Sequence, residues 1–205
     1  MNNYFKYNDK DTVKNGKKIL KKYLKDYDPD IHNFLIILCI GTDRCTGDAL
    51  GPLVGYLLRD MDYDNIRVVG TLDFPVHAGN INEMIEHLYD VYMNPFIIAI
   101  DASLCEDEEK VGYINIRQGG LNPGEALKKN IQQIGDITIS GVTSTTISDD
   151  PEARYMVLSS VRLNLVMNIA ESIAGIIKQT LKTEHKKNYL KVVWKQLFYC
   201  IIIMR

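Results

Sequence analysis

The stretch that decides the fold is FLIILCIG, residues Phe34 to Gly41, an unbroken apolar run that leads into a polar loop. A strand covered by helices on both faces has this composition, because neither of its faces meets water. The run FIIAI, residues Phe96 to Ile100, repeats the pattern and is followed by Asp101. Two such strands predict a mostly parallel sheet at the centre of the domain.

Helical patterns alternate with these strands. Asn80 and Glu83 resemble a capping box at the start of one of the helices. The alternation predicts an α/β fold, a three-layer, doubly wound and mostly parallel sheet with helices on both faces. Helices are expected near residues 20–27, 53–61, 80–92, 122–135 and 151–180, and further strands near residues 66–70, 111–118 and 136–143.

The chain of 205 residues is long enough for one well-packed domain. We predict an N-terminal helical segment over residues 1–30, a single α/β domain over residues 31–181, and a tail over residues 182–205 that is basic and then apolar. The tail contains FYCIII, residues 198–203, which has high β-propensity. Its role stays open between an edge strand, a docking segment and an appendage.

Composition argues against several classes of partner. The formal net charge is -2 with 24% charged residues, so there is no global electrostatic reason to expect a nucleic acid or an anionic membrane. The N-terminus lacks the apolar core of a signal peptide, and the apolar runs are shorter than a membrane span. The four cysteines form no C-x-x-C pair. A cytoplasmic protein with reduced thiols and without an organic cofactor is expected.

Two acids adjoin the carboxyl ends of the central strands. Asp48 closes the loop after the first strand, and Asp101 is predicted as the last residue of the second. Ligands of open α/β sheets bind beyond these strand ends, so the two carboxylates are expected to converge on one crevice. A close pair shares a proton, and one member can then take a proton from water while the other donates to the substrate. Alternatively, both bind a divalent metal that activates water, or they are merely a helix cap and a turn residue.

A thiol nucleophile is a weaker alternative. Cys45 and Cys105 follow the two loops, and His77 in DFPVHAGN is a possible base. No local signature supports this arrangement, and free cysteines are more often inert apolar residues. His77 is better interpreted as a loop histidine that lines the cleft.

Two further motifs give only weak indications of function. The glycine-containing loop over residues 41–52 superficially resembles a phosphate-binding loop, but it lacks the G-x-G-x-x-G spacing, and Asp48 would repel an anion. The hydroxyl run TSTTIS, residues 143–148, can donate hydrogen bonds to a peptide backbone or can serve as plain turn chemistry. A binding module without turnover therefore remains the strongest rival to an enzyme.

The segments GTDRCTGDALGPLVG, residues 41–55, and AIDASLCE, residues 99–106, resemble the sporulation proteins called YyaC. Those proteins are similar to the germination protease of endospore-forming bacteria, whose catalytic aspartates fall on Asp48 and Asp101 here. GGLNPGE, residues 119–125, and ISGVTSTT, residues 139–146, also resemble loops of that family. The resemblance covers roughly residues 34–177.

More distantly, the chain is similar to hydrogenase-maturation endopeptidases, whose two site carboxylates also fall on Asp48 and Asp101. Their third site residue is a histidine, which has no counterpart among residues 143–146. This departure favours a site without a metal.

The resemblance implies a spore-associated endopeptidase of the germination-protease-like aspartic type, active in sporulation or germination in the forespore or spore interior. Asp48 and Asp101 are the expected catalytic pair, and small acid-soluble spore proteins are the expected substrate class. The alternative is a non-catalytic sporulation protein that binds a peptide or protein partner in the same cleft. The oligomeric state stays open. The expected substrate-binding residues are Thr46, His77, Gly141, Thr143 and Ser144.

Overall fold

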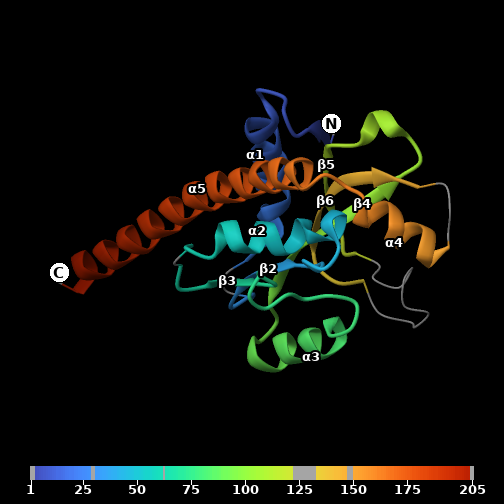
Figure 1. Ribbon diagram of the computed structural model, residues 1–205. Helices are drawn as coiled ribbons and strands as arrows, with labels where there is room; N and C mark the ends of the chain where they lie inside the picture. The colour runs from blue at the N-terminus through green and yellow to red at the C-terminus, as the bar shows by residue number, and fades with distance from the viewer. Residues whose placement is uncertain (1–2, 29–30, 62, 122–132, 147–149, 204–205) are drawn as a thin grey trace.

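The computed structural model describes residues 3–28, 31–61, 63–121, 133–146 and 150–203, with side chains through residue 183. The described residues form a six-stranded sheet in the order β1-β5-β6-β4-β2-β3 (Figure 1). The elements, with η for short 3-10 helices, are β1 (Tyr4–Lys6), α1 (Thr12–Tyr23), η1 (Leu24–Asp26), β2 (Leu35–Cys39), η2 (Thr46–Ala49), α2 (Leu50–Leu58), β3 (Ile66–Val69), α3 (Ile81–Val91), β4 (Phe96–Cys105), η3 (Glu108–Lys110), β5 (Tyr113–Gln118), β6 (Ile137–Thr145), α4 (Pro151–Ser159) and α5 (Leu163–Ile203).

The sheet is mostly parallel, which confirms the predicted fold class. β2 pairs in parallel with β3 and β4, and β4 pairs in parallel with β6. β5 runs antiparallel to its neighbours β6 and β1. Every residue of β2 is buried, and so are the first five residues of β4. The two apolar runs are therefore central strands that are covered on both faces.

Alternate residues of the central strands enter two separate cores, as the period of a strand requires. Figure 1 shows α1, α2 and α5 on one face of the sheet and α3 on the other. The core beneath α1, α2 and α5 includes Leu35, Ile37, Cys39, Ile98 and Ile100. The core beneath α3 includes Ile36, Leu38, Ile97, Ala99 and Leu88. Helices therefore cover both faces, and the sheet is the middle of three layers.

The single long helix predicted over residues 151–180 is wrong, because the structure has two helices there. α4 begins after Asp150, whose side chain accepts a backbone N–H of the first turn at 3.0 Å. After α4 the Ser160 hydroxyl donates to the Val157 carbonyl at 2.8 Å, a local bond that competes with the helical pattern. An 87° bend then separates α4 from α5. The apolar spacing continues across this break, so it carried no signal of the bend.

Both ends of the chain differ from the expected outline. The N-terminal segment adds a strand, β1, to the edge of the sheet. The tail is helical to Ile203, so the boundary expected after residue 181 falls inside α5, whose far end extends away from the sheet (Figure 1). In the described part of the chain no single helix is long and apolar enough to cross a membrane, although α4 together with α5 up to Thr183 passes that test as a bent pair.

Two local predictions have other outcomes. The helix expected from residue 122 falls mainly on residues 122–132, which lie outside the described residues. The capping box at Asn80 is wrong, because the Asn80 side chain makes no capping bond to α3. It accepts the His77 N–H instead, at 2.8 Å.

Candidate active site at the edge of the sheet

Asp101 lies at the point where β4 continues past the end of β2. β2 ends at Cys39, opposite Ile100, whereas β4 runs on beside β6 to Cys105. The prediction that Asp101 is the last residue of its strand is therefore wrong, because pairing with β6 prolongs the strand. Asp101 is nevertheless the first residue of β4 beyond the end of β2. By strand alternation its side chain leaves the sheet on the α3 face, as Ala99 does.

A turn directly after β2 organises the region at the carboxyl ends of β2 and β4. It does so through three consecutive backbone N–H groups. Each N–H group donates a hydrogen bond either to a predicted site residue or to the residue that directly precedes a predicted site residue. The donor pairs are Ile40 to the Ile100 carbonyl (2.8 Å), Gly41 to the Val76 carbonyl (2.8 Å) and Thr42 to Asp48 Oδ2 (3.0 Å). Because Ile100 precedes Asp101 and Val76 precedes His77, this one turn fixes the backbone next to both residues and the carboxylate of Asp48 itself.

Gly41 is required by the geometry of this turn. Its φ is +143°, and a Cβ at this position would lie 2.0 Å from the Asp48 carbonyl oxygen. We expect Gly41→Ala to lower the free energy of unfolding by about 2–3 kcal/mol, measured by urea denaturation. The matched control is Gly175→Ala in α5, where the added Cβ would lie 3.5 Å from Val13. This helical substitution should be neutral or stabilise by up to about 1 kcal/mol, and equal stability of the two variants would contradict the turn geometry.

The two carboxyl groups lie within electrostatic reach of each other. Burial, followed by the negative charge of Asp48, raises the pKa of Asp101 from its ordinary value of 3.8 to about 8, and a hydrogen bond from the Ala102 backbone opposes this rise. Burial also raises the pKa of Asp48, while the Thr42 N–H and the charge of His77 act in the opposite direction. Near neutral pH Asp101 therefore keeps its proton, and the donors around Asp48 favour its carboxylate form.

His77 lies in the loop before α3, near the carboxyl end of β2. Its N–H donates to Asn80 Oδ1 at 2.8 Å, and its ring Nδ1 accepts the Gly79 N–H at 3.0 Å. Val76, the preceding residue, pairs with Ile40 in an isolated parallel bridge. The loop is thus anchored beside the turn that binds Asp48.

The remaining predicted site residues have different surroundings. Thr46 opens η2 and is partly exposed. Gly141 is buried in β6, where an added Cβ would lie 2.5 Å from Leu50 Cδ2, so it packs beneath the helices of the opposite face. Thr143 is the extra residue of an irregularity in the β4–β6 pairing, and its buried hydroxyl has no hydrogen-bond partner among the described residues. Asp48, Asp101 and His77 are the predicted residues that the structure brings together.

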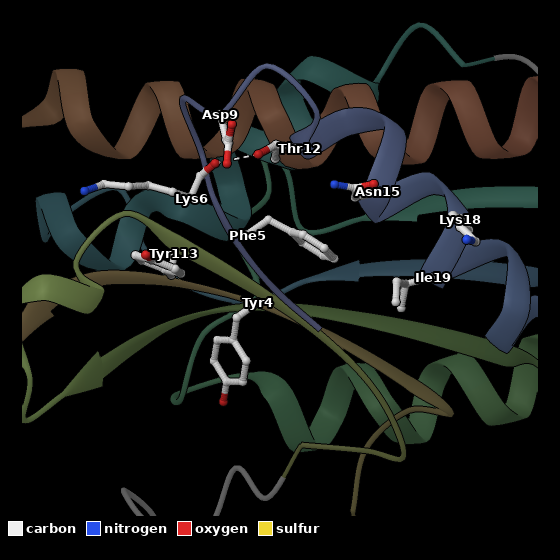
Figure 2. A pocket seen from close by; sticks show the side chains of 9 residues that line it. All are labelled: Tyr4, Phe5, Lys6, Asp9, Thr12, Asn15, Lys18, Ile19 and Tyr113. Atoms are coloured by element: carbon white, nitrogen blue, oxygen red, sulfur yellow. Dashed lines mark hydrogen bonds between the residues drawn. The ribbon is translucent and has the colours of Figure 1, made fainter. Parts of the chain in front are cut away.

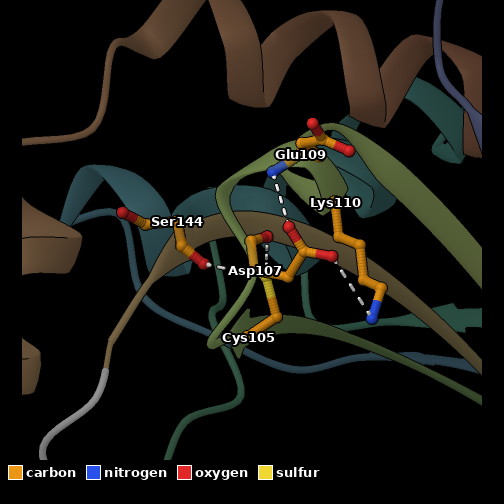
Figure 3. A network of polar contacts seen from close by, with 5 residues as sticks. All are labelled: Cys105, Asp107, Glu109, Lys110 and Ser144. Atoms are coloured by element: carbon orange, nitrogen blue, oxygen red, sulfur yellow. Dashed lines mark hydrogen bonds and ion pairs between the residues drawn. The ribbon is translucent and has the colours of Figure 1, made fainter.

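Ser144 lies in a polar network around Cys105, not among these three residues (Figure 3). The Cys105 thiol donates to the Asp107 carbonyl at 3.0 Å and lies 3.9 Å from the Ser144 carbonyl oxygen. Asp107 also accepts the Glu109 N–H at 3.0 Å and contacts Lys110 Nζ at 3.6 Å. This network is a turn stabilised by local polar contacts.

The contacts of the thiols do not favour a cysteine nucleophile. Cys45 is 3% exposed, and its sulfur lies 3.5 Å from the Ser159 hydroxyl. The hydrogen bonds of Cys105 go to backbone carbonyls, and the described ring contact of His77 goes to Gly79. No hydrogen bond among the described residues joins either thiol to His77.

Two other features bear on ligand binding. Among the residues that the structure describes, no group of three or more His, Cys, Asp or Glu side chains is arranged to hold a metal ion. A pocket of about 400 Å³ lies between β1, α1 and the start of β5 (Figure 2). No predicted site residue lines it. Its lining residues are Tyr4, Phe5, Lys6, Asp9, Thr12, Asn15, Lys18, Ile19 and Tyr113.

Three contributors to the site carried little sequence signal. Thr42 and Ile40 act through backbone N–H groups, which any residue except proline supplies. Ser140 is the register partner of Asp101 on β6, and only the strand register identifies it. Asn80 did stand out in the sequence, but as a cap and not as the anchor of the His77 loop.

Comparison with known proteins places this architecture among α/β proteins with a peptidase-like fold. The crystal structure of a [NiFe] hydrogenase maturation protease, HycI from Thermococcus kodakarensis KOD1, is similar to it with a TM-score of 0.51 and 17% identity, over 80% of this chain and 99% of that one. At this level of identity the similarity shows the fold alone.

The chain belongs to the DUF1256 family, described as a protein of unknown function, whose profile matches residues 4–176. It is 42% identical over 156 residues to the uncharacterized protein YyaC of Bacillus subtilis (strain 168), which covers 76% of this chain and 74% of that protein. The resemblance to YyaC proteins, and the more distant one to maturation endopeptidases in fold, are thereby confirmed.

Proposed function

We propose that the protein is an endopeptidase that hydrolyses peptide bonds with Asp48 and Asp101 as an acid/base pair. The observation that carries this proposal is the unequal electrostatic environment of two nearby carboxyl groups at the edge of a parallel sheet. The pKa of Asp101 is raised to about 8, in part by the charge of Asp48. Perturbed pairs of this kind are a mark of sites that exchange protons.

The environments support a different proposed role for each member of the pair. Asp48 accepts a backbone hydrogen bond from Thr42 at 3.0 Å and is the member suited to act as a carboxylate. As a general base it takes a proton from a water molecule that attacks the scissile carbonyl carbon. Asp101, which holds its proton at neutral pH, donates it to the carbonyl oxygen or to the leaving amine. When Asp101 has protonated the leaving amine, the proton that Asp48 took from water passes to Asp101, and this transfer restores the starting state of the pair.

The biological setting is part of the proposal. The resemblance of the loops that contain Asp48 and Asp101 to those of the germination protease is the basis for proposing a role in sporulation or germination, with small acid-soluble spore proteins as the proposed substrates. The proposed location is the cytoplasm of the forespore or the spore interior. No nucleic acid, membrane or organic cofactor takes part in the proposed reaction.

The direct test is cleavage of purified small acid-soluble spore proteins by the wild-type chain and by the double variant Asp48→Asn/Asp101→Asn. We expect wild type to produce discrete fragments, identified by mass spectrometry, and the double variant to produce none. Circular dichroism spectra of the two proteins establish that both are folded. Equal fragment yields from wild type and the folded double variant would end the proposal.

A second function is favoured by the surface of α4. No residue within α4 is buried, and Tyr155 and Met156 are 58% and 72% exposed. Leu158 of the same helix lies against Gly47 of η2, next to Asp48. Exposed apolar side chains on a helix beside a candidate site are typical of surfaces that bind a protein or peptide. On this alternative the chain captures a sporulation partner without cleaving it, and both Asn variants would bind that partner as tightly as wild type.

A further inference from the structure

We propose that His77 is the positioning residue of the site and that its ring, with a proton fixed on Nε2, stabilises the ionised form of Asp48. The inference deepens the proposed function, because the proposed base must be ionised before it can take a proton from water. The state of Asp48 can nevertheless be measured without any turnover. The two ideas can therefore fail separately.

The turn after β2 places His77 and Asp48 beside each other. The Gly41 N–H donates to the Val76 carbonyl at 2.8 Å, and Val76 directly precedes His77. The next N–H, that of Thr42, donates to Asp48 Oδ2 at 3.0 Å. Successive amides of one turn thus hold the backbone before His77 and the carboxylate of Asp48.

The loop before α3 makes hydrogen bonds to both the backbone and the ring of His77. Asn80 clamps the loop, since its Oδ1 accepts the His77 N–H at 2.8 Å and its Nδ2 donates to the Pro75 carbonyl at 3.0 Å. The Gly79 N–H donates to His77 Nδ1 at 3.0 Å. The bond from Gly79 restricts the rotation of the imidazole, and the bonds of Asn80 hold the backbone that carries it.

The contact with Gly79 also decides the protonation pattern of the ring. A nitrogen that accepts a hydrogen bond carries no proton, so neutral His77 bears its proton on Nε2. The imidazolium form bears protons on both nitrogens. Nε2 therefore remains a donor in either form.

The charges around the pair agree with this assignment. The charge of His77 favours the ionised form of Asp48 and opposes the effect of burial on its pKa. The charge of Asp48 acts in turn on Asp101. Asp48 from η2, Asp101 from β4 and His77 from the loop before α3 are the described ionisable groups that act on one another here.

The experiment is a titration of the Asp48 carboxyl carbon by 13C NMR in wild type and in His77→Asn. Asparagine removes the ring but places its Oδ1 where it can still accept the Gly79 N–H, so the loop keeps its anchor. We expect the ratio of ionised to protonated Asp48 at a fixed pH to fall about threefold in this variant. The matched control is His87→Asn, an exposed position on α3, which should leave the titration of Asp48 unchanged.

A second measurement uses wild type alone and keeps the proposal testable if His77→Asn does not fold. Ring 15N chemical shifts of neutral His77 should report the tautomer protonated on Nε2. Superimposed Asp48 titrations in wild type and folded His77→Asn, or a neutral ring protonated on Nδ1, would overturn the proposal. Absence of peptide cleavage by wild type would instead refute the proposed function and leave these two measurements unaffected.

Discussion

Asp101→Asn is expected to lower kcat/KM for cleavage of small acid-soluble spore proteins by about 10²–10⁴-fold. Asparagine has nearly the same shape, but it carries no proton that it can transfer to the leaving group. Asp48→Asn should have an effect of similar size, because it removes the carboxylate that accepts a proton from water. Both rates are measured at fixed pH on proteins shown by circular dichroism to be folded.

The dependence of the wild-type rate on pH provides a second readout of the same prediction. Asp101 has to be protonated to act as an acid, and its pKa is raised to about 8, so the rate should fall as the pH rises through about 8. If Asp101→Asn keeps a measurable cleavage rate, that rate should not decrease as the pH rises through about 8.

The matched control is Asp43→Asn, which removes an exposed acid from the same loop as Asp48. It should retain activity within about twofold of wild type, as substitutions remote from the chemistry do. Activity of Asp101→Asn within tenfold of wild type would refute the role of Asp101 as the acid.

The central strands and the convergence of the two acids were accessible from the sequence for a physical reason. A strand buried on both faces must be apolar throughout, so β2 and the first half of β4 stand out as uninterrupted runs. Parallel strands place their carboxyl ends at one edge, so the polar residues that follow them are brought to one region. Asp48 and Asp101 were found by this rule, although β4 continues beyond Asp101.

The organisation of the site was not accessible in the same way. The N–H groups of Ile40, Gly41 and Thr42 act through the backbone, and their partners are determined by the path of distant loops. The break between α4 and α5 coincides with local hydrogen bonds of Ser160, whereas the apolar periodicity continues across it. Asn80 was also misassigned from the sequence. Its neighbours in the sequence are typical of a helix cap, whereas its side chain contacts the loop that contains His77.

The same substitution that removes activity should make the folded protein more stable at neutral pH. In the folded state Asp101 keeps its proton up to a pH of about 8, whereas an unfolded chain ionises this group near its ordinary value of 3.8. Between these two values the unfolded state releases the proton and the folded state does not, so this group lowers the free energy of unfolding as the pH rises. Below the ordinary value it costs nothing, and above about pH 8 its cost is constant.

One unit of pKa difference corresponds to about 1.4 kcal/mol. Asp101 is partly accessible to water, so we expect a cost of about 2–4 kcal/mol, less than that of a fully enclosed carboxyl group. The stability of Asp101→Asn relative to wild type should therefore increase by this amount between pH 4 and pH 8, measured by urea denaturation at constant ionic strength. The change with pH isolates ionisation, because any difference in packing between Asp and Asn contributes equally at both pH values.

The matched control for this measurement is Asp90→Asn, an exposed position on α3. Its stability relative to wild type should stay within about 0.5 kcal/mol over the same range, as is usual for surface substitutions. A constant difference between Asp101→Asn and wild type from pH 4 to pH 8 would show that Asp101 is ionised in the folded protein at neutral pH. Asp101 would then have no proton to donate, and it could not act as the proposed acid. The expected increase would instead show that the fold keeps a destabilising protonated carboxyl group at the end of its central strands.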